Sequence, residues 1–402
     1  MAASTAPSLG HEGRPSAGTP RLWVERLTLT DFRNYPTLSL DLSPGAIVLV
    51  GANGSGKTNV LEAVSLLAPG QGLRQAPFAD LTRAEGAGSW SIFARVNTAL
   101  GPVDIGTGLA PDQPSRSTER TGRIVRIEGE QRSGSGALAD YVEMVWVTPA
   151  TDGLFLGPAS ERRRFLDRLI ACFDSGHRTR TGHFERAMAS RNRLLADGVR
   201  ENARLEGLEL VMAETGVAIA AARAEAVAAL AAVITQRRAR DPASPFPWSK
   251  LALAGTIDAD LARLPAVDVE DAYMKVLREM RERDRAAGRT LDGPHRSDLS
   301  VTHGPKDMPA RLCSTGEQKA LLLGLVLAHA ELVKERQEGM APALLLDEVT
   351  AHLDEARRHA LFAELLRLEC QAWMTGTDQQ AFAALSGRAQ FWRLDGGFAT
   401  AL

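Results

Sequence analysis

Residues 51–58 read Gly-Ala-Asn-Gly-Ser-Gly-Lys-Thr, which is a complete phosphate-binding loop pattern. The apolar run 46–50 precedes the loop, and apolar residues at helical spacing follow it until Pro69. A buried strand that leads into a glycine-rich turn and a helix N-terminus directs backbone N–H groups toward a phosphate. This order of elements predicts an α/β core with a nucleotide site. A turn that binds nothing would not explain the Lys-Thr pair at the start of the helix.

The last two residues of the loop are of the types that bind phosphate and Mg²⁺ in such a site. Lys57 would reach the β- and γ-phosphates, and Thr58 would hold Mg²⁺ through its hydroxyl. ATP and Mg²⁺ are therefore the expected cofactors. The other loop residues expected around the triphosphate are Gly51, Ala52, Asn53, Gly54, Ser55 and Gly56.

A second part of the site is predicted near the carboxyl end of the sequence. The apolar run 343–346 ends in Asp347 and Glu348, as expected for a buried strand that presents carboxylates at its end. Asp347 suits a Mg²⁺ contact, direct or through water, and Glu348 can polarise the attacking water. Alone, this pattern could be an acidic strand end that faces solvent. Together with the upstream loop, it predicts Glu348 and Lys57 as the catalytic pair.

Residues 313–319 open a strongly apolar helix that is expected over residues 320–330. Ser314 is a good N-cap, and Glu317 completes a capping box, which explains both residues by helix stability alone. A helix start with a serine hydroxyl and a glycine is also an anion site. Both interpretations use the same local geometry.

This segment resembles the signature motif of the ATP-binding-cassette ATPases, Leu-Ser-Gly-Gly-Gln, which ends in Glu in the SMC-like branch. The match is at Ser314, Gly316 and Glu317, and residues 351–354, ending in Asp354, stand where that class has its D-loop. The resemblance implies that two heads enclose two ATP molecules. Each ATP would be held by the phosphate loop of one chain and the signature of the other.

Within that class, the chain resembles the RecF family of bacterial recombination mediators. The resemblance implies an ATP-dependent homodimer that binds DNA, with duplex DNA at gap junctions as the expected form. It also implies RecR- and RecO-type partners and adds Arg33, Asn34 and Asn59 to the expected nucleotide contacts. The segments that carry the resemblance are 32–35, 56–59, 162–167, 190–192 and 293–298.

The sequence departs from the class in two places. Residues 373–377 read Trp-Met-Thr-Gly-Thr where many such ATPases have a switch histidine, so γ-phosphate sensing there would fall to a threonine. Between Gln71 and Gln131, no glutamine can be assigned as the one that links Mg²⁺ to the helical lobe. Both departures favour slow hydrolysis that serves as a switch.

The hydrophobic patterns divide the chain into four parts. We expect a disordered tail over 1–21, the first part of the ATPase head over 22–155, a helical lobe or short antiparallel arm over 156–290, and the rest of the head over 291–402. The expected fold class is α/β, an ATP-binding-cassette head with a mixed sheet and flanking antiparallel strands. The expected helices after the phosphate loop are 161–172, 183–196, 205–238 and 268–287, and residues 89–147 are expected to form an antiparallel sheet.

The formal net charge is −2, so any nucleic-acid partner must meet a local basic patch. One stretch is rich in arginine and could contact DNA phosphates, although a charge run is more often a solvated helix face. Arg164 or Arg168 could instead pair with Glu161 or Asp167 at helical spacing. The arginines of the stretch are Arg162, Arg163, Arg164, Arg168, Arg178, Arg180, Arg186, Arg191, Arg193 and Arg200.

No secretory signal or membrane anchor is expected. The first twenty residues lack an apolar run, and the apolar stretch 211–234 is interrupted by Glu214, Arg223 and Glu225. Three widely separated cysteines give neither metal-ligand spacing nor a disulfide framework. We therefore expect a cytoplasmic, nucleoid-associated protein.

Three other functions remain open from the sequence. In a long-armed SMC-like tether, a long coiled coil would separate the two parts of the head, but only about 250 residues lie between Thr58 and Ser314. The energy-supplying subunit of a membrane transporter would need a coupling surface for membrane partners. A structural scaffold would bind nucleotide without hydrolysing it.

Overall fold

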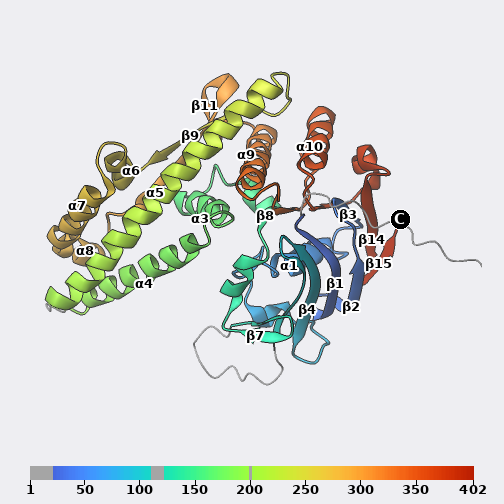
Figure 1. Ribbon diagram of the computed structural model, residues 1–402, viewed down its shortest axis with the longest axis horizontal. Coiled ribbons are helices and arrows are strands. Elements are labelled where there is room, and N and C mark those ends of the chain that lie inside the picture. The colour runs from blue at the N-terminus through green and yellow to red at the C-terminus, as the bar shows by residue number, and fades with distance from the viewer. Residues whose placement is uncertain (1–20, 110–121, 199–201) are drawn as a thin grey trace, which may run out of the picture.

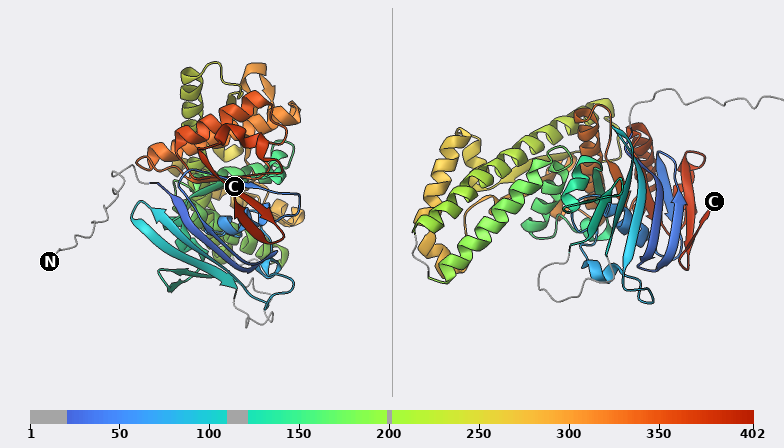
Figure 2. Two further views of the ribbon diagram at one scale, coloured as in Figure 1. Left: turned by 90° about the vertical axis from the view of Figure 1, so that its right-hand side faces the viewer. Right: turned by 60° about the horizontal axis from the view of Figure 1, so that its bottom comes forward.

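The computed structural model describes residues 21–109, 122–198 and 202–402, so the expected tail falls outside the described residues, apart from Arg21. Two sheets and their helices form a head, and a long helical arm extends away from it (Figures 1 and 2). The head uses segments from both ends of the chain, and the arm is inserted between them.

The centre of the head is a six-stranded, mostly parallel sheet in the order β15-β14-β3-β13-β12-β8. Five strands run parallel, and β15 is antiparallel at one edge. The strand before the phosphate loop, β3, therefore lies next to β13 and one strand away from β12, which ends before Asp347. The strands are β3 (Ala46–Val50), β8 (Met144–Val147), β12 (Ala343–Leu346), β13 (Ala372–Gly376), β14 (Ala389–Asp395) and β15 (Phe398–Ala401).

The parallel sheet is buried on both faces, which explains the continuous apolar runs of its strands. All five residues of β3 are buried. Ile47 and Leu49 pack toward the second sheet, whereas Val48 and Val50 pack toward helices on the opposite face. Because successive side chains of a strand alternate between faces, one short run serves two cores.

The second sheet is antiparallel, in the order β2-β1-β4-β5-β6-β7, and packs with α1 against the parallel sheet. The two strands expected around the polar turn at residues 33–34 are confirmed. The expectation that residues 142–147 join the antiparallel sheet was wrong, because β8 pairs with β12 in the parallel sheet. The antiparallel strands are β1 (Trp23–Phe32), β2 (Tyr35–Asp41), β4 (Trp90–Thr98), β5 (Gly101–Leu109), β6 (Ile124–Ile127) and β7 (Glu130–Arg132).

Helices cover both faces of the parallel sheet (Figure 1). On one face, α1 (Lys57–Ser65) packs in the core between the parallel sheet and the antiparallel sheet. On the other face lie α9 (Thr315–Arg336) and α10 (Glu355–Leu368), together with α3 (Ala159–Ile170) and part of α5. A single turn, α2 (Pro149–Asp152), follows β8. Short 3-10 helices are Phe78–Leu81, Ser135–Asp140, Pro294–Arg296, Gly304–Lys306, Ala310–Leu312 and Gln379–Leu385.

The arm consists mainly of α4 (Gly176–Ala196) and the 39-residue α5 (Asn202–Arg240), with α6, α7 and α8 packed near its outer end (Figure 1). The expected helix 268–287 is divided at Met280, which separates α7 from α8. α5 continues through Gly216 without a break. A Cβ at this position would lie 3.1 Å from Tyr273 and 3.2 Å from Phe184, so the glycine allows these side chains to pack closely against the helix. The shorter helices are α6 (Thr256–Leu261), α7 (Ala266–Glu279) and α8 (Arg281–Ala287).

By length and composition alone, α5 could cross a membrane, but 50% of its most apolar window is buried inside the structure. A small sheet of β9 (Ser249–Ala254), β10 (Asp298–His303) and β11 (Met308–Pro309) joins the arm to the head. β9 lies within the range expected to be helical, and it pairs with β10 beyond residue 290.

Glu143, just before β8, gives a prediction on pH and stability. Burial raises the pKa of this carboxyl to about 7 from its ordinary 4.5, although Gln337 donates a hydrogen bond to it. Between these two pH values the unfolded chain releases a proton that the folded chain keeps, so stability falls as the pH rises. Glu143→Gln should remove this penalty, which is up to about 3 kcal/mol. The thermal unfolding midpoint should rise by several degrees at pH 8 and change little at pH 4.

Glu335→Gln provides the control for this experiment, because Glu335 is exposed on α9, the helix that precedes Gln337. Its midpoint should follow the wild type at both pH values. A Glu143→Gln variant with the same pH dependence as the wild type would contradict the assignment.

Candidate nucleotide-binding site

The phosphate loop depends on glycine at two positions of close approach. Gly56 has φ +101° and begins α1, and a Cβ there would lie 2.4 Å from the Tyr35 hydroxyl. A Cβ on Gly51 would lie 2.4 Å from the carbonyl oxygen of Leu394. Both distances are shorter than any real contact, so the chain can turn here only without side chains. The turn brings the N-terminus of α1 to the end of β3.

The Lys57 ammonium lies inside this loop. Its side chain is mostly buried, and Nζ donates to the carbonyl oxygens of Gly51 (2.8 Å) and Ala52 (2.7 Å). Burial lowers the pKa of Lys57, while the carboxylates of Glu348 and Asp347 oppose that change. A bound phosphate would replace these two neutral carbonyl oxygens with charged oxygens, which accept stronger hydrogen bonds from an ammonium.

Thr58 and Asp347 provide oxygen ligands that fit Mg²⁺. The Thr58 hydroxyl lies 3.1 and 3.0 Å from the two carboxylate oxygens of Asp347, although 289 positions separate the residues in sequence. Mg²⁺ is commonly bound by one or two protein oxygens plus waters and substrate phosphates. These two side chains would hold the ion, which when bound neutralises charge on the phosphates. The structure thus brings together the two residues that the sequence assigned to the metal.

Glu348 follows directly, with its side chain exposed and its backbone at φ +47°. Its N–H donates to the hydroxyl of Thr375 at 2.8 Å, and that hydroxyl donates to Asp347 Oδ1 at 2.7 Å. Thr375 is completely buried and contacts both Asp347 and Glu348. Of the two threonines considered from the sequence, only Thr377 is exposed, in a hollow that also borders Gly51.

A cavity of about 560 Å³ extends from this site to α3. Thr58, Asp347 and Glu348 line it, together with Arg74 and Gln75 from the segment after α1. Among the described glutamines from Gln71 to Gln131, Gln75 is the one that lines this cavity, so it is the candidate for the link to Mg²⁺ that the sequence left unassigned. Its only sequence signal is its position shortly after the helix ends at Pro69-Gly70, which is too weak to single it out. On the α3 side, the cavity is lined by Glu161, Arg164, Phe165 and Arg168.

The turn between β1 and β2 packs against the phosphate loop and α1. Arg33 forms two hydrogen bonds of 2.9 Å with the buried carboxylate of Glu62 on α1, which fix its guanidinium against this helix. Asn34 accepts a hydrogen bond from Asn59 at 2.7 Å and lies against Gly56. Arg33, Asn34 and Asn59 therefore all lie beside the loop, and their nucleotide contacts stay predictions.

The signature segment forms the start of α9. Ser314 is the N-cap, and Glu317 completes the capping box by accepting hydrogen bonds from the Ser314 N–H (3.1 Å) and hydroxyl (3.0 Å). Lys306 donates a hydrogen bond to Glu317 at 2.5 Å. This hydrogen bond and the one from the Ser314 N–H together lower the pKa of Glu317 to about 2. The capping interpretation is thus correct, and Ser314 also remains exposed for an anion.

The signature lies beside the D-loop of the same chain. A Cβ on Gly316 would lie 3.2 Å from the carbonyl oxygen of His352. Asp354 caps α10 by accepting a hydrogen bond from the N–H of Arg357 at 2.8 Å. No residue from 313 to 317 lines the cavity that contains Thr58 and Glu348. Within the residues described, the signature therefore does not complete the phosphate site of its own chain.

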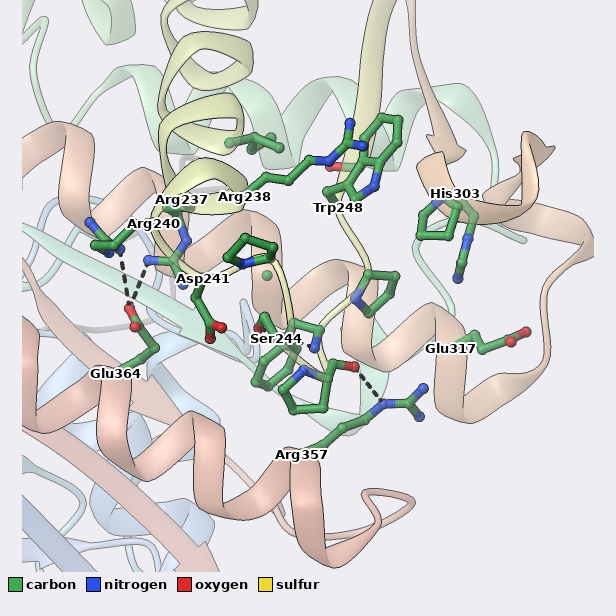
Figure 3. Close-up of a pocket in the computed structure, with 18 of the residues that line it drawn as sticks. Arg237, Arg238, Arg240, Asp241, Ser244, Trp248, His303, Glu317, Arg357 and Glu364 are labelled. Atoms are coloured by element: carbon green, nitrogen blue, oxygen red, sulfur yellow. Dashed lines mark hydrogen bonds and ion pairs between the residues drawn. The ribbon is translucent and has the colours of Figure 1, made fainter.

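A second cavity, of about 450 Å³, lies behind the signature and is bordered by Glu317 (Figure 3). Arg357 donates to the carbonyl of Pro245 at 3.3 Å, and the guanidinium of Arg238 lies 4.3 Å from the centre of the Trp248 ring. Arg237 pairs with Glu364 at 2.9 Å. These contacts join the end of α5 and the segment that follows it to α10.

Most of the arginine-rich stretch is also structural, which corrects the predicted basic patch. Arg162 pairs with both oxygens of Asp298, and Arg191 is completely buried. The predicted pairing of Arg164 or Arg168 with Glu161 or Asp167 was wrong. Asp167 instead pairs with Arg223 (2.7 Å) and His177 (2.8 Å), and Arg168 lies over the Trp146 ring. Arg163, Arg178 and Arg180 contact Ser297, Pro69 and Asp174; Arg164, Arg186 and Arg193 are exposed, and Arg200 lies outside the described residues.

The sequence is similar to a known protein family and to named proteins over nearly its whole length. The family model described as the RecF/RecN/SMC N terminal domain matches residues 23–388. The DNA replication and repair protein RecF of Mesorhizobium japonicum is 54% identical over 374 residues, covering 93% of this chain and 96% of the relative. RecF of Brucella suis biovar 1 is 51% identical over 383 residues, covering 95% and 97%.

Solved structures confirm the predicted fold class. The chain superposes on the recombination mediator protein RecF-ATPrS in the RecFOR pathway with a TM-score of 0.81 and 21% identity, covering 96% of this chain and 99% of that one. An Smc head domain with an extended coiled coil from Pyrococcus furiosus gives a TM-score of 0.55 at 18% identity, covering 95% and 96%. At these identities, the likeness shows the fold alone.

Proposed function

The chain belongs to the RecF family, and we propose that it is an ATP-dependent, DNA-binding recombination mediator with slow ATP hydrolysis. The observation that carries the proposal is the contact of Thr58 with Asp347, because it assembles a phosphate loop and a metal-binding carboxylate from distant parts of the chain. Glu348 lies next to this contact, at the edge of the same cavity.

Each group in the site has a separate role in the proposed reaction. Lys57 and the loop N–H groups bind the β- and γ-phosphates. Thr58 and Asp347 would hold Mg²⁺. Glu348 accepts a hydrogen bond from the attacking water and polarises it toward the γ-phosphorus. Thr375 accepts a hydrogen bond from the Glu348 N–H and donates one to the Asp347 carboxylate, and so fixes both residues.

Two copies of the chain would complete the site. Ser314 is exposed at the start of α9 and lies outside the cavity of its own chain, so a second chain can present its own Ser314, Gly316 and Glu317 to the bound ATP. Asp354, beside the signature, would enter the same interface. Loss of the γ-phosphate removes the shared contact and weakens the dimer, so ATP acts as a switch.

Family membership supports DNA as the partner. We propose that the dimer closes on duplex DNA at single-strand gaps and helps to load a recombinase there with RecR- and RecO-type mediators, in the cytoplasm. The exposed Arg164, Arg186 and Arg193 are the remaining candidates for phosphate contacts from the arginine-rich stretch.

The experiment that tests this function measures the size and the DNA retention of the protein with ATP, with ADP and with neither. Wild-type protein should become a dimer and retain a gapped duplex only with ATP. Lys57→Ala removes a charge-assisted phosphate contact, so ATP affinity should fall by about 10–100-fold and the dimer should be lost at ATP concentrations that saturate the wild type.

Lys275→Ala, on the exposed surface of α7, is the matched control and should behave as the wild type. ATP-independent dimers with unchanged DNA retention would contradict the proposal. ATP-dependent dimers without turnover would favour the scaffold, and co-fractionation with membranes would favour a transporter subunit.

A further inference from the structure

A buried lysine connects the signature helix to the turn that carries Glu348. Lys319 lies five residues after Ser314 on α9, and only 1% of it is exposed. Its Nζ donates to the carbonyl oxygen of Glu348 at 3.0 Å and to Asp152 Oδ2 at 3.2 Å. A buried ammonium is costly unless it is paired, and Asp152, at the end of α2, supplies the opposite charge. One side chain thus joins α9, α2 and the end of β12.

The backbone of Glu348 is strained and is held from both sides. A non-glycine residue at φ +47° costs about 1–2 kcal/mol and persists only where its surroundings enforce it. The N–H of Glu348 donates to Thr375, and its carbonyl accepts from Lys319. The Glu348 carboxylate makes no hydrogen bond or ion pair with any residue that the structure describes. Its position is therefore set by its backbone.

The two ends of this connection serve different ATP molecules. This inference rests on the proposed function, in which Ser314 contacts the ATP of the partner chain and Glu348 acts on the ATP of its own chain. Lys319 extends from the same helix that Ser314 caps, and it holds the residue that polarises the water. A movement of α9 when Ser314 takes up a γ-phosphate therefore reaches Glu348 through a single hydrogen bond.

We propose that Lys319 is a positioning residue that couples occupation of the signature in one chain to the orientation of Glu348 in that same chain. Hydrolysis of the two ATP molecules then becomes interdependent, because each signature responds to the partner's ATP and adjusts the carboxylate for its own. Asp152 neutralises the lysine, and Thr375 fixes the other side of the peptide unit.

The test compares Lys319→Met with the wild type. Removing the carbonyl contact frees the backbone of Glu348, so kcat should fall by about 10–100-fold, as is typical when a group that orients a reacting residue is lost. The KM for ATP and the ATP-dependent dimerisation should stay within about threefold, since the loop and Ser314 are untouched. The lifetime of the ATP dimer should lengthen, and the dependence of rate on ATP concentration should lose its cooperativity. Lys319→Arg, which can still donate to the carbonyl, should recover part of kcat.

Lys334→Met is the matched control. Lys334 lies on the same helix and also donates to a backbone carbonyl, that of Leu368 at 3.0 Å, but far along the sequence from the signature. Its kcat and dimer lifetime should follow the wild type. A Lys334→Met variant that loses turnover as Lys319→Met does would show that the effect is a general one on α9.

A second variant separates positioning from charge balance. In Asp152→Asn/Lys319→Met no buried charge is left unpaired, so folding should be kept even if Lys319→Met alone is unstable. The proposal requires that kcat stays low in this double variant. Recovery of kcat to within about twofold of the wild type would overturn it, since Lys319 would then serve only to balance Asp152. Failure of the proposed function looks different: the wild type would show no turnover, or Glu348→Gln would hydrolyse ATP as fast as the wild type.

Discussion

Glu348→Gln is expected to lower the rate of ATP hydrolysis by about 10²–10⁴-fold, the usual contribution of a positioned general base. An amide has nearly the shape of the carboxylate but cannot take a proton from water. The substitution leaves the local backbone intact, because Thr375 and Lys319 contact the N–H and carbonyl of residue 348 and not its side chain. ATP binding should therefore be unchanged, and steady-state phosphate release measures the loss.

The same variant should trap the ATP-bound dimer, since the step that weakens it is blocked. Sizing after removal of free ATP would show a dimer that persists much longer than that of the wild type. Glu355→Gln serves as the control, because Glu355 is an exposed acid in the first turn of α10. Its turnover should match the wild type. If Glu348→Gln releases phosphate at the wild-type rate, the water is polarised by another group.

The local parts of the site could be predicted from the sequence because each is a short pattern with its own physical cause. The run before Gly51 needs burial on both faces, which only an inner parallel strand provides. The same holds for the run before Asp347. Glycines at 51 and 56 are required by approaches that no Cβ could make. The contact of Thr58 with Asp347 then follows from placing both strand ends at one edge of the sheet.

The neighbours of each strand could not be predicted with the same success. Residues 144–147 are an apolar run that suits an antiparallel or a parallel strand equally well, and its pairing with β12 is a contact between segments about 200 positions apart. The break at Met280 is similar, because the helical pattern continues through it and only packing separates α7 from α8.

Charged residues were the least predictable part of the site. A lysine or arginine looks the same in a sequence whether it faces solvent or lies in the core. Lys319 is buried against Glu348, and Arg33 is held by Glu62, yet both stand in segments where a nucleotide contact was the natural expectation. Each is explained only by the acid or carbonyl that folding brings to it, and no spacing rule identifies that partner.

Arg191→Met is expected to destabilise the arm by about 3–5 kcal/mol, the usual cost of removing one partner from a buried ion pair. The guanidinium is completely buried and binds Glu209 (3.0 Å), Asp284 (2.7 Å), Thr290 (2.9 Å) and the carbonyl of Leu277 (2.7 Å). It thereby joins α4, α5, α7 and α8. Without it, Asp284 keeps a buried charge with no cation, whereas Glu209 still has Arg281. Urea unfolding measures the loss, and hydrogen exchange should locate it in the arm.

Two further variants identify the cause of that loss. Arg193→Met, two residues away on the exposed side of α4, should change stability by less than about 0.5 kcal/mol. Arg191→Met/Asp284→Asn removes the charge that Arg191→Met leaves uncompensated, so it should recover part of the stability. An equal loss in Arg191→Met and Arg193→Met would mean that surface charge on α4, and not the buried network, sets the stability of the arm. Because Arg191 is completely buried, Arg191→Met should weaken DNA retention only to the extent that the arm unfolds.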